Sequence, residues 1–169
     1  MTKAELLRRK EQLEKDIAKY SNMQLAKKVQ LNSAYGALGN QWFRFYDIRQ
    51  ATAITKSGQL SIKWIEARIN EYLNKLLETE NEDYVLASDT DSLYITFDKL
   101  IKKFTPKNPV TFLDHVAKER IEPFIDKAYQ ELADRMNAYD QKMFMKREAI
   151  ADKGIWTAKK RYMLNVYDN

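Results

Sequence analysis

Two aspartates separated by one residue lie between two apolar runs near the middle of the chain. The stretch at 84–97 reads Tyr-Val-Leu-Ala-Ser-Asp-Thr-Asp-Ser-Leu-Tyr-Ile-Thr-Phe. Its β-branched and aromatic residues predict strands at 84–88 and 92–97, joined by a tight turn that carries Asp89 and Asp91. Carboxylates this close repel each other, and Mg²⁺ removes that repulsion by binding one or two of them together with substrate phosphates. An acidic, solvated turn is the alternative, but the apolar flanks predict a buried hairpin whose acids need a partner.

A second candidate lies at 27–40, where Lys28, Asn32 and Tyr35 are spaced to share one face of a helix. A cation, an amide and an aromatic ring on one stripe are suited to a phosphate, a polar group and a flat base or sugar. The alternative is an ordinary helix end, with a glycine stop at Gly36 or Gly39.

A third candidate is the basic run Lys159-Lys160-Arg161-Tyr162. Strands are expected at 143–150 and 154–167, joined by a hairpin turn at 151–154. Strand alternation then places Lys160 and Tyr162 on one face and Lys159 and Arg161 on the other. Cations next to aromatic rings fit a nucleic-acid groove, while a charged edge strand that resists aggregation is the alternative.

Long helices must position these candidates. Thr2 and Glu5 form a capping-box pair at the start of an amphipathic helix that runs into residue 31 or beyond. A second long helix is expected at 47–78 and a third at 111–138, where Pro123 either kinks the helix or starts a new one. Helices combined with antiparallel hairpins predict an α+β fold.

Composition limits the classes of protein that fit. The chain has 169 residues, no cysteine and no apolar run long enough to span a bilayer, so we expect a soluble, intracellular domain. The net charge of +5 is uneven: residues 1–31 carry +4, residues 32–141 carry −3 and residues 142–169 carry +4. Basic ends around an acidic centre favour a polyanionic partner.

The three candidates, in this order, resemble the palm and distal fingers of family B DNA polymerases, and are most similar to those of T4-like phages. The resemblance covers essentially the whole chain. It implies an antiparallel palm-type sheet with a central catalytic hairpin packed on two long helices, plus a protruding N-terminal fingers helix. Residues 1–38 then form the fingers helix, and residues 39–169 form a palm domain that lacks its N-terminal strands and the thumb.

The resemblance also implies roles for individual residues. Lys28 and Asn32 match residues that contact the incoming triphosphate, Tyr35 matches the aromatic against the nascent base pair, and Gly36 matches a site of close template approach. Asp91 matches a metal-binding carboxylate, Asp89 its partner, and Glu148 an acidic residue close to the metals. The residues that match the motif holding the primer duplex are Lys159, Lys160, Arg161 and Tyr162.

The implied reaction adds dNTPs to a primer 3′ end through two Mg²⁺ ions. The family's first catalytic aspartate lies in an Asp-x-x-Ser-Leu-Tyr-type motif upstream of the hairpin, and no such motif precedes the hairpin here. We therefore expect a fragment, or one subunit of a split polymerase, that is inactive without the N-terminal polymerase portion. The implied setting is phage-encoded and in the host cytoplasm, with primer–template DNA, dNTP and a sliding clamp bound through an absent C-terminal region as partners. A non-catalytic duplex DNA-binding module and a Mg²⁺-dependent phosphohydrolase are the alternative functions.

Overall fold

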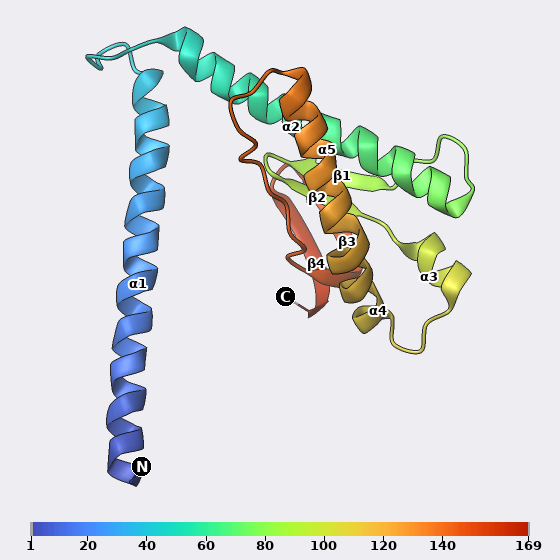
Figure 1. The fold of residues 1–169 in the computed structure, drawn as a ribbon, viewed down its shortest axis with the longest axis horizontal. Helices are drawn as coiled ribbons and strands as arrows, with labels where there is room; N and C mark the ends of the chain where they lie inside the picture. Colours follow the sequence, from blue (N-terminus) through green and yellow to red (C-terminus); the bar gives the residue numbers. More distant parts are fainter. Residues whose placement is uncertain (1, 169) are drawn as a thin grey trace. The chain divides into compact units, whose positions relative to one another are not determined.

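Helices and antiparallel hairpins alternate along the chain in a computed structural model that describes residues 2–168 (Figure 1). The elements are α1 (Lys3–Leu38), α2 (Ile48–Leu77), β1 (Val85–Asp89), β2 (Ser92–Ile95), α3 (Asp98–Phe104), α4 (Pro109–Val116), the π-helical turn η1 (Ala117–Ile121), α5 (Glu122–Arg135), β3 (Ile150–Ala158) and β4 (Arg161–Asp168). This order confirms the predicted α+β class. The structure divides into two compact units, with the boundary between Lys56 and Ser57.

The first helix begins and ends where its sequence signals lie. The Thr2 hydroxyl accepts a hydrogen bond from the Glu5 N–H at 3.3 Å, and the Glu5 carboxylate accepts one from the Thr2 N–H at 2.7 Å. This is the predicted capping box. At the other end α1 stops at Leu38, with Gly39 as its C-cap. The 36-residue helix buries none of its side chains.

The core of the second unit lies where α2 and α5 meet the first hairpin (Figure 1). Both helices have apolar residues at helical spacing, which places one stripe of each against the other. From β2 and the residue stretch after it, Leu93, Ile95 and Phe97 pack against this core. Its buried members are Ile65, Ile69, Leu73, Leu77, Tyr84, Leu100, Ile121, Ile125, Ala128, Tyr129 and Leu132.

The third predicted helix is divided by a π-helical turn. Helix α4 runs into η1, where the Glu122 N–H donates to the Ala117 carbonyl five residues back, and α5 follows at once. Pro123 has no N–H to donate, and it lies in the first turn of α5, where none is needed. The sequence prediction of an internal start at Pro123 is therefore confirmed.

The second hairpin turns at a different place from the one predicted. Residues 143–149 are not in a strand, and β3 and β4 are joined by a two-residue turn at Lys159 and Lys160 instead of a turn at 151–154. The two turn lysines therefore do not alternate on strand faces as predicted. Gly154 misled the prediction, because a Cβ at this mid-strand glycine would lie 2.6 Å from the Trp156 ring. The glycine makes room for that ring and does not form a turn.

The strands form two separate two-stranded sheets among the described residues, β1–β2 and β3–β4, both antiparallel. The part of the chain between residues 2 and 168 also holds no helix with the length and apolar character needed to cross a bilayer.

Candidate functional site

The two aspartates occupy unequal positions on the first hairpin. Asp89 ends β1, pairs with Ser92 across the hairpin and is half-buried, whereas Asp91 lies in the turn and is exposed. The prediction that the hairpin is buried is wrong for its tip, because only the face toward α2 and α5 is covered. Exposure leaves the Asp91 carboxylate accessible to a ligand.

The turn between them is tight and strained. The Asp91 N–H donates to the Asp89 carbonyl at 2.6 Å, and the Thr90 hydroxyl donates to the Asp89 carboxylate at 2.9 Å. Thr90 has φ 53°, a left-handed conformation that costs a β-branched residue about 1–3 kcal/mol. The surrounding structure must compensate for this strain. The tight turn holds the two aspartates close together.

One face of this hairpin carries Asp89 together with Tyr94. The register pairs Asp89 with Ser92 and Ala87 with Tyr94, so these four side chains share a face. Leu93 and Ile95, two residues apart on β2, pack against the core, whereas Ser88, the partner of Leu93 in register, is exposed. One face of the hairpin therefore carries Asp89 and Tyr94, while Leu93 and Ile95 attach the other face to the core.

An aromatic cluster on the polar face joins the two hairpins. The Tyr94 ring makes edge contacts with Trp156 of β3 and Tyr162 of β4, with ring centroids 5.3 Å apart in each case. Trp156 and Tyr162 are cross-strand partners whose rings stack at 6.4 Å. Sequence reasoning missed Tyr94, although its position two residues after Ser92 placed it on the Asp89 face.

The chemistry around the Tyr94 hydroxyl is acidic and crowded. Hydrogen bonding to Tyr162 raises the pKa of Tyr94 to about 12, and burial and the negative charges of Asp89 and Glu148 add to this shift. Tyr94 is therefore a neutral hydrogen-bonding group at any physiological pH. Asp89 and Glu148 are far apart in sequence, but the negative charge of each acts on the Tyr94 hydroxyl.

Basic side chains crowd the turn of the second hairpin. Lys159, Lys160 and Arg161 are all exposed, and none takes part in an ion pair within residues 2–168. Lys160 has φ 62°. Unpaired cations on a narrow turn suit contact with a phosphate backbone.

The base of the second hairpin is fixed by Arg147, a residue that the sequence did not single out. Its guanidinium lies 2.6 Å from the Asp114 carboxylate of α4 and 2.9 Å from the Asp168 carboxylate at the end of β4. The backbone N–H of Arg147 donates to the Glu122 carboxylate of α5 at 3.0 Å. These bonds tie the strand ends, and the exposed Glu148 beside them, to the helices.

The acids meet only part of the requirement for a divalent cation. No group of three His, Cys, Asp or Glu side chains suited to a metal comes together in the described stretch 2–168, so Asp89, Asp91 and Glu148 do not form a closed cage. Two carboxylates on a rigid turn nevertheless fit Mg²⁺, which keeps waters and takes its other ligands from substrate phosphates.

In the first unit, the predicted nucleotide-binding residues and Gly36, predicted to lie against the template, follow one another along exposed turns of α1. Lys28, Asn32, Tyr35 and Gly36 all lie in this helix. A Cβ added to Gly36 would meet no heavy atom within 4 Å, so no residue between 2 and 168 requires glycine there by its packing.

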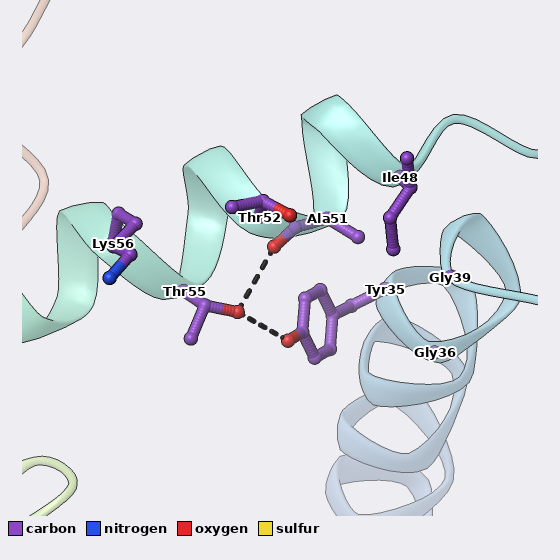
Figure 2. A pocket seen from close by; sticks show the side chains of 8 residues that line it. All are labelled: Tyr35, Gly36, Gly39, Ile48, Ala51, Thr52, Thr55 and Lys56. Carbon is purple, nitrogen blue, oxygen red and sulfur yellow. Dashed lines mark hydrogen bonds between the residues drawn. The ribbon is translucent and has the colours of Figure 1, made fainter.

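Tyr35 points toward the start of α2 (Figure 2). The Thr55 hydroxyl donates to the Ala51 carbonyl at 3.0 Å, so the Tyr35 hydroxyl donates to the Thr55 oxygen, 2.7 Å away. This bond fixes the ring at the side of an open pocket of about 300 Å³, whose other lining residues are Gly36, Gly39, Ile48, Ala51, Thr52 and Lys56 (Figure 2). The ring is held in place yet remains partly exposed.

Comparison with known proteins identifies the family. The profile described as DNA polymerase family B matches residues 1–169. The chain is 52% identical over 159 residues to the DNA-directed DNA polymerase of Escherichia phage RB69, which covers 86% of this chain and 18% of that protein. It is 49% identical over 172 residues to the DNA-directed DNA polymerase of Enterobacteria phage T4, which covers 94% of this chain and 19% of that protein. The chain thus spans about a fifth of the length of these relatives, and it belongs to DNA polymerase family B.

Proposed function

We propose that this chain is the part of a DNA-directed DNA polymerase that holds the primer terminus, the incoming dNTP and the catalytic metal ions. The observation that carries the proposal is the identity of about one half to two proteins named DNA-directed DNA polymerase, over most of this chain. The whole enzyme's activity is part of the proposal, because the chain spans only 18% and 19% of those relatives.

The first hairpin is the proposed catalytic element of a palm domain. Asp91 and, beside it, Asp89 would hold Mg²⁺, and a bound pair of Mg²⁺ ions would activate the primer 3′-hydroxyl and stabilise the leaving pyrophosphate. The protein contributes position, because Asp89 is fixed in the strand while Asp91 is presented on the strained turn. Glu148 adds to the negative charge that acts on Tyr94.

The second hairpin is the proposed grip on the primer duplex. Lys159, Lys160 and Arg161 neutralise phosphates, and Tyr162 lies beside the minor groove. Support comes from their exposure and from the lack of an ion pair to Lys159, Lys160 or Arg161 among the described residues. Such contacts set register and orientation without reading sequence.

Helix α1 is the proposed fingers element. Lys28 and Asn32 contact the triphosphate, and Tyr35 lies against the nascent base pair. Gly36 provides the most specific support, because it lies in the last turn of α1 and a Cβ there would meet no heavy atom within 4 Å among the described residues. We attribute the glycine to close approach of the template strand.

The chain requires the rest of the polymerase for catalysis, because no Asp-x-x-Ser-Leu-Tyr motif precedes the hairpin. The partners we propose are primer–template DNA, dNTP, the N-terminal polymerase portion and, through a C-terminal region, a sliding clamp. The setting is the host cell of a phage, since both relatives are phage proteins.

Primer extension with dNTPs and Mg²⁺ tests this proposal. The chain is assayed alone and together with the N-terminal polymerase portion, supplied from the T4 relative. We expect extension only in the mixture. Extension by the chain alone would contradict its dependence on a partner. Duplex binding without extension in either case would favour the alternative of a non-catalytic DNA-binding module.

Gly36→Ala gives a second, more local test. Alanine should raise the stability of α1, by less than the roughly 1 kcal/mol typical of a helix interior because Gly36 lies in the last turn, and there is space for the added methyl group. Extension should nevertheless fall if the template passes this position. Gly58→Ala in α2 is the matched control, because a Cβ there also meets nothing within 4 Å and no ligand contact is proposed for it. Equal activity of the two variants would remove Gly36 from the template path.

A further inference from the structure

Neither Tyr94 nor Trp156 has a role in the proposed mechanism, but with Tyr162 they form an aromatic cluster that joins the two hairpins that the mechanism needs. Its contacts are the ring-to-ring contacts that join β2 to β3 and β4. Tyr94 links the cluster to the turn that carries the aspartates, since it shares a face of the first hairpin with Asp89. Trp156 and Tyr162 link it to the basic turn, since only one residue pair, Ala158–Arg161, separates them from Lys159 and Lys160.

From this geometry we propose that Tyr94 is a positioning residue that sets the distance between the carboxylates of the first turn and the cations of the second. The inference rests on the proposed function. Primer phosphates held by the basic turn must place the 3′-hydroxyl at the aspartates, and the relative position of the two hairpins decides whether they do.

The physical basis is that the second hairpin has few other supports near its turn. Most of β3 and β4 is exposed, and among the described residues of these two strands only Ile150, at the start of β3, is buried. The Arg147 ion pairs hold the opposite end of the hairpin, next to Asp168. Near the turn, the contacts with the Tyr94 ring resist bending. Aromatic pairs of this kind stabilise a structure beyond the burial of their area.

The ring and the hydroxyl of Tyr94 have separable roles. Edge contacts at 5.3 Å depend on the ring, which Tyr94→Phe retains and Tyr94→Leu removes. Positioning by the ring therefore predicts that phenylalanine rescues what leucine loses. A role for the hydroxyl near Asp89 and Glu148 would instead make the two variants equally defective.

The first arm of the test measures position directly in the 169-residue chain. The chain has no cysteine, so spin labels can be placed at Leu86→Cys on β1 and Ile155→Cys on β3, both exposed. We expect a narrow distance distribution in the parent and in Tyr94→Phe, and a broad one in Tyr94→Leu. The control is Tyr72→Leu, which removes a different stacked pair, Tyr72–Phe124 at 4.5 Å, from the core. A narrow distribution in Tyr94→Leu, or equal broadening in the control, overturns the proposal.

The second arm measures kcat for primer extension and Kd for duplex DNA in the complemented polymerase, below the Tm of every variant. Misplacement by about 1 Å lowers rates by about 100-fold, so Tyr94→Leu should lose about that much kcat while its Kd stays near the parent value. Tyr94→Phe and Tyr72→Leu should keep kcat. Normal kcat in Tyr94→Leu overturns this inference alone. A parent that neither binds duplex nor extends a primer overturns the proposed function as well, and the inference with it.

Discussion

The two hairpins have the same design and opposite surroundings. Each has two antiparallel strands, a two-residue turn and one turn residue with φ above 50°. The first has an apolar face packed on α2 and α5, while the second is exposed along nearly its whole length. Carboxylates that hold a metal must be fixed within about 0.5 Å, and the helices packed on the first hairpin do this, whereas the turn of the second hairpin depends for its position on the ring contacts with Tyr94. The two turns are thus held in position by different contacts.

The largest expected effect removes the charge of the first turn. Asp91→Asn should lower nucleotide addition by at least about 10²–10³-fold, because it removes electrostatic stabilisation where charge develops. Duplex binding should remain nearly intact, since the cations of the second turn are unchanged. Single-turnover extension and fluorescence anisotropy measure the two quantities. Retained activity would rule out a metal-binding role for Asp91.

Gly154→Ala should disturb the second hairpin through its packing. The new methyl group would lie 2.6 Å from the Trp156 ring and 2.8 Å from the Leu164 side chain. Overpacking of this kind costs about 1–3 kcal/mol. Thermal unfolding should show the loss of stability, and the displaced Trp156 should change its fluorescence. A variant as stable as the parent would show that the ring moves aside freely.

Lys160→Ala should weaken duplex binding through charge alone. Each phosphate contact contributes about 0.9 to the slope of log K against log salt concentration, so the slope should decrease by about that amount. Lys153→Ala is the matched control, because Lys153 is an exposed lysine of the same hairpin away from the turn. Equal slopes in the two variants would indicate that the turn lysines serve only to keep the strands soluble.

The two left-handed turn residues offer a finer comparison. Thr90→Gly should stabilise the chain by about 1–2 kcal/mol, since glycine adopts positive φ without strain. Lys160→Gly should stabilise it less, because lysine is not β-branched and tolerates this conformation better than threonine. Urea unfolding of both variants tests the order. Destabilisation by Thr90→Gly would mean that its hydroxyl bond to Asp89 outweighs the strain.

The smallest effect concerns pH at the base of the second hairpin. Lys118 and Arg147 hold the pKa of Asp114 below its usual 3.8. A lowered folded-state pKa contributes stability above the unfolded-state value, and this contribution is lost as the pH falls through the folded-state pKa. Asp114→Asn should therefore reduce the loss of stability in acid, below pH 4 or so, as measured by circular dichroism. An unchanged acid transition would exclude this ion pair as its cause.

Local signals in the sequence predicted the helices well. The Thr2–Glu5 capping box and Gly39 mark the ends of α1, and Pro123 marks the start of α5. These signals act within one or two turns of the residue that carries them. The first hairpin was also predicted, because its strands flank a turn of two polar residues.

Features that depend on distant contacts could not be read from the sequence. Gly154 signals a turn locally, and only the Trp156 ring above it explains a glycine inside a strand. The contact of Tyr94 with Trp156 joins residues 62 positions apart, and the bond from the Arg147 N–H to Glu122 joins two separate segments. The exposure of Asp91 depends likewise on which face of the hairpin the helices cover.

Helix α1 buries no side chain, and this has a consequence for its dynamics. Its stability comes from its cap and from i,i+4 pairs such as Lys10–Glu14 and Glu11–Lys15, each contributing about 0.2–0.5 kcal/mol. Apart from the Tyr35–Thr55 bond near its C-terminal end, α1 relies on local bonds among the described residues, and a helix of this kind melts gradually, turn by turn, instead of together with the core. Its backbone amides should exchange with deuterium far sooner than those of α2. Ordering of α1 by a bound nucleotide would then contribute a large negative entropy to binding.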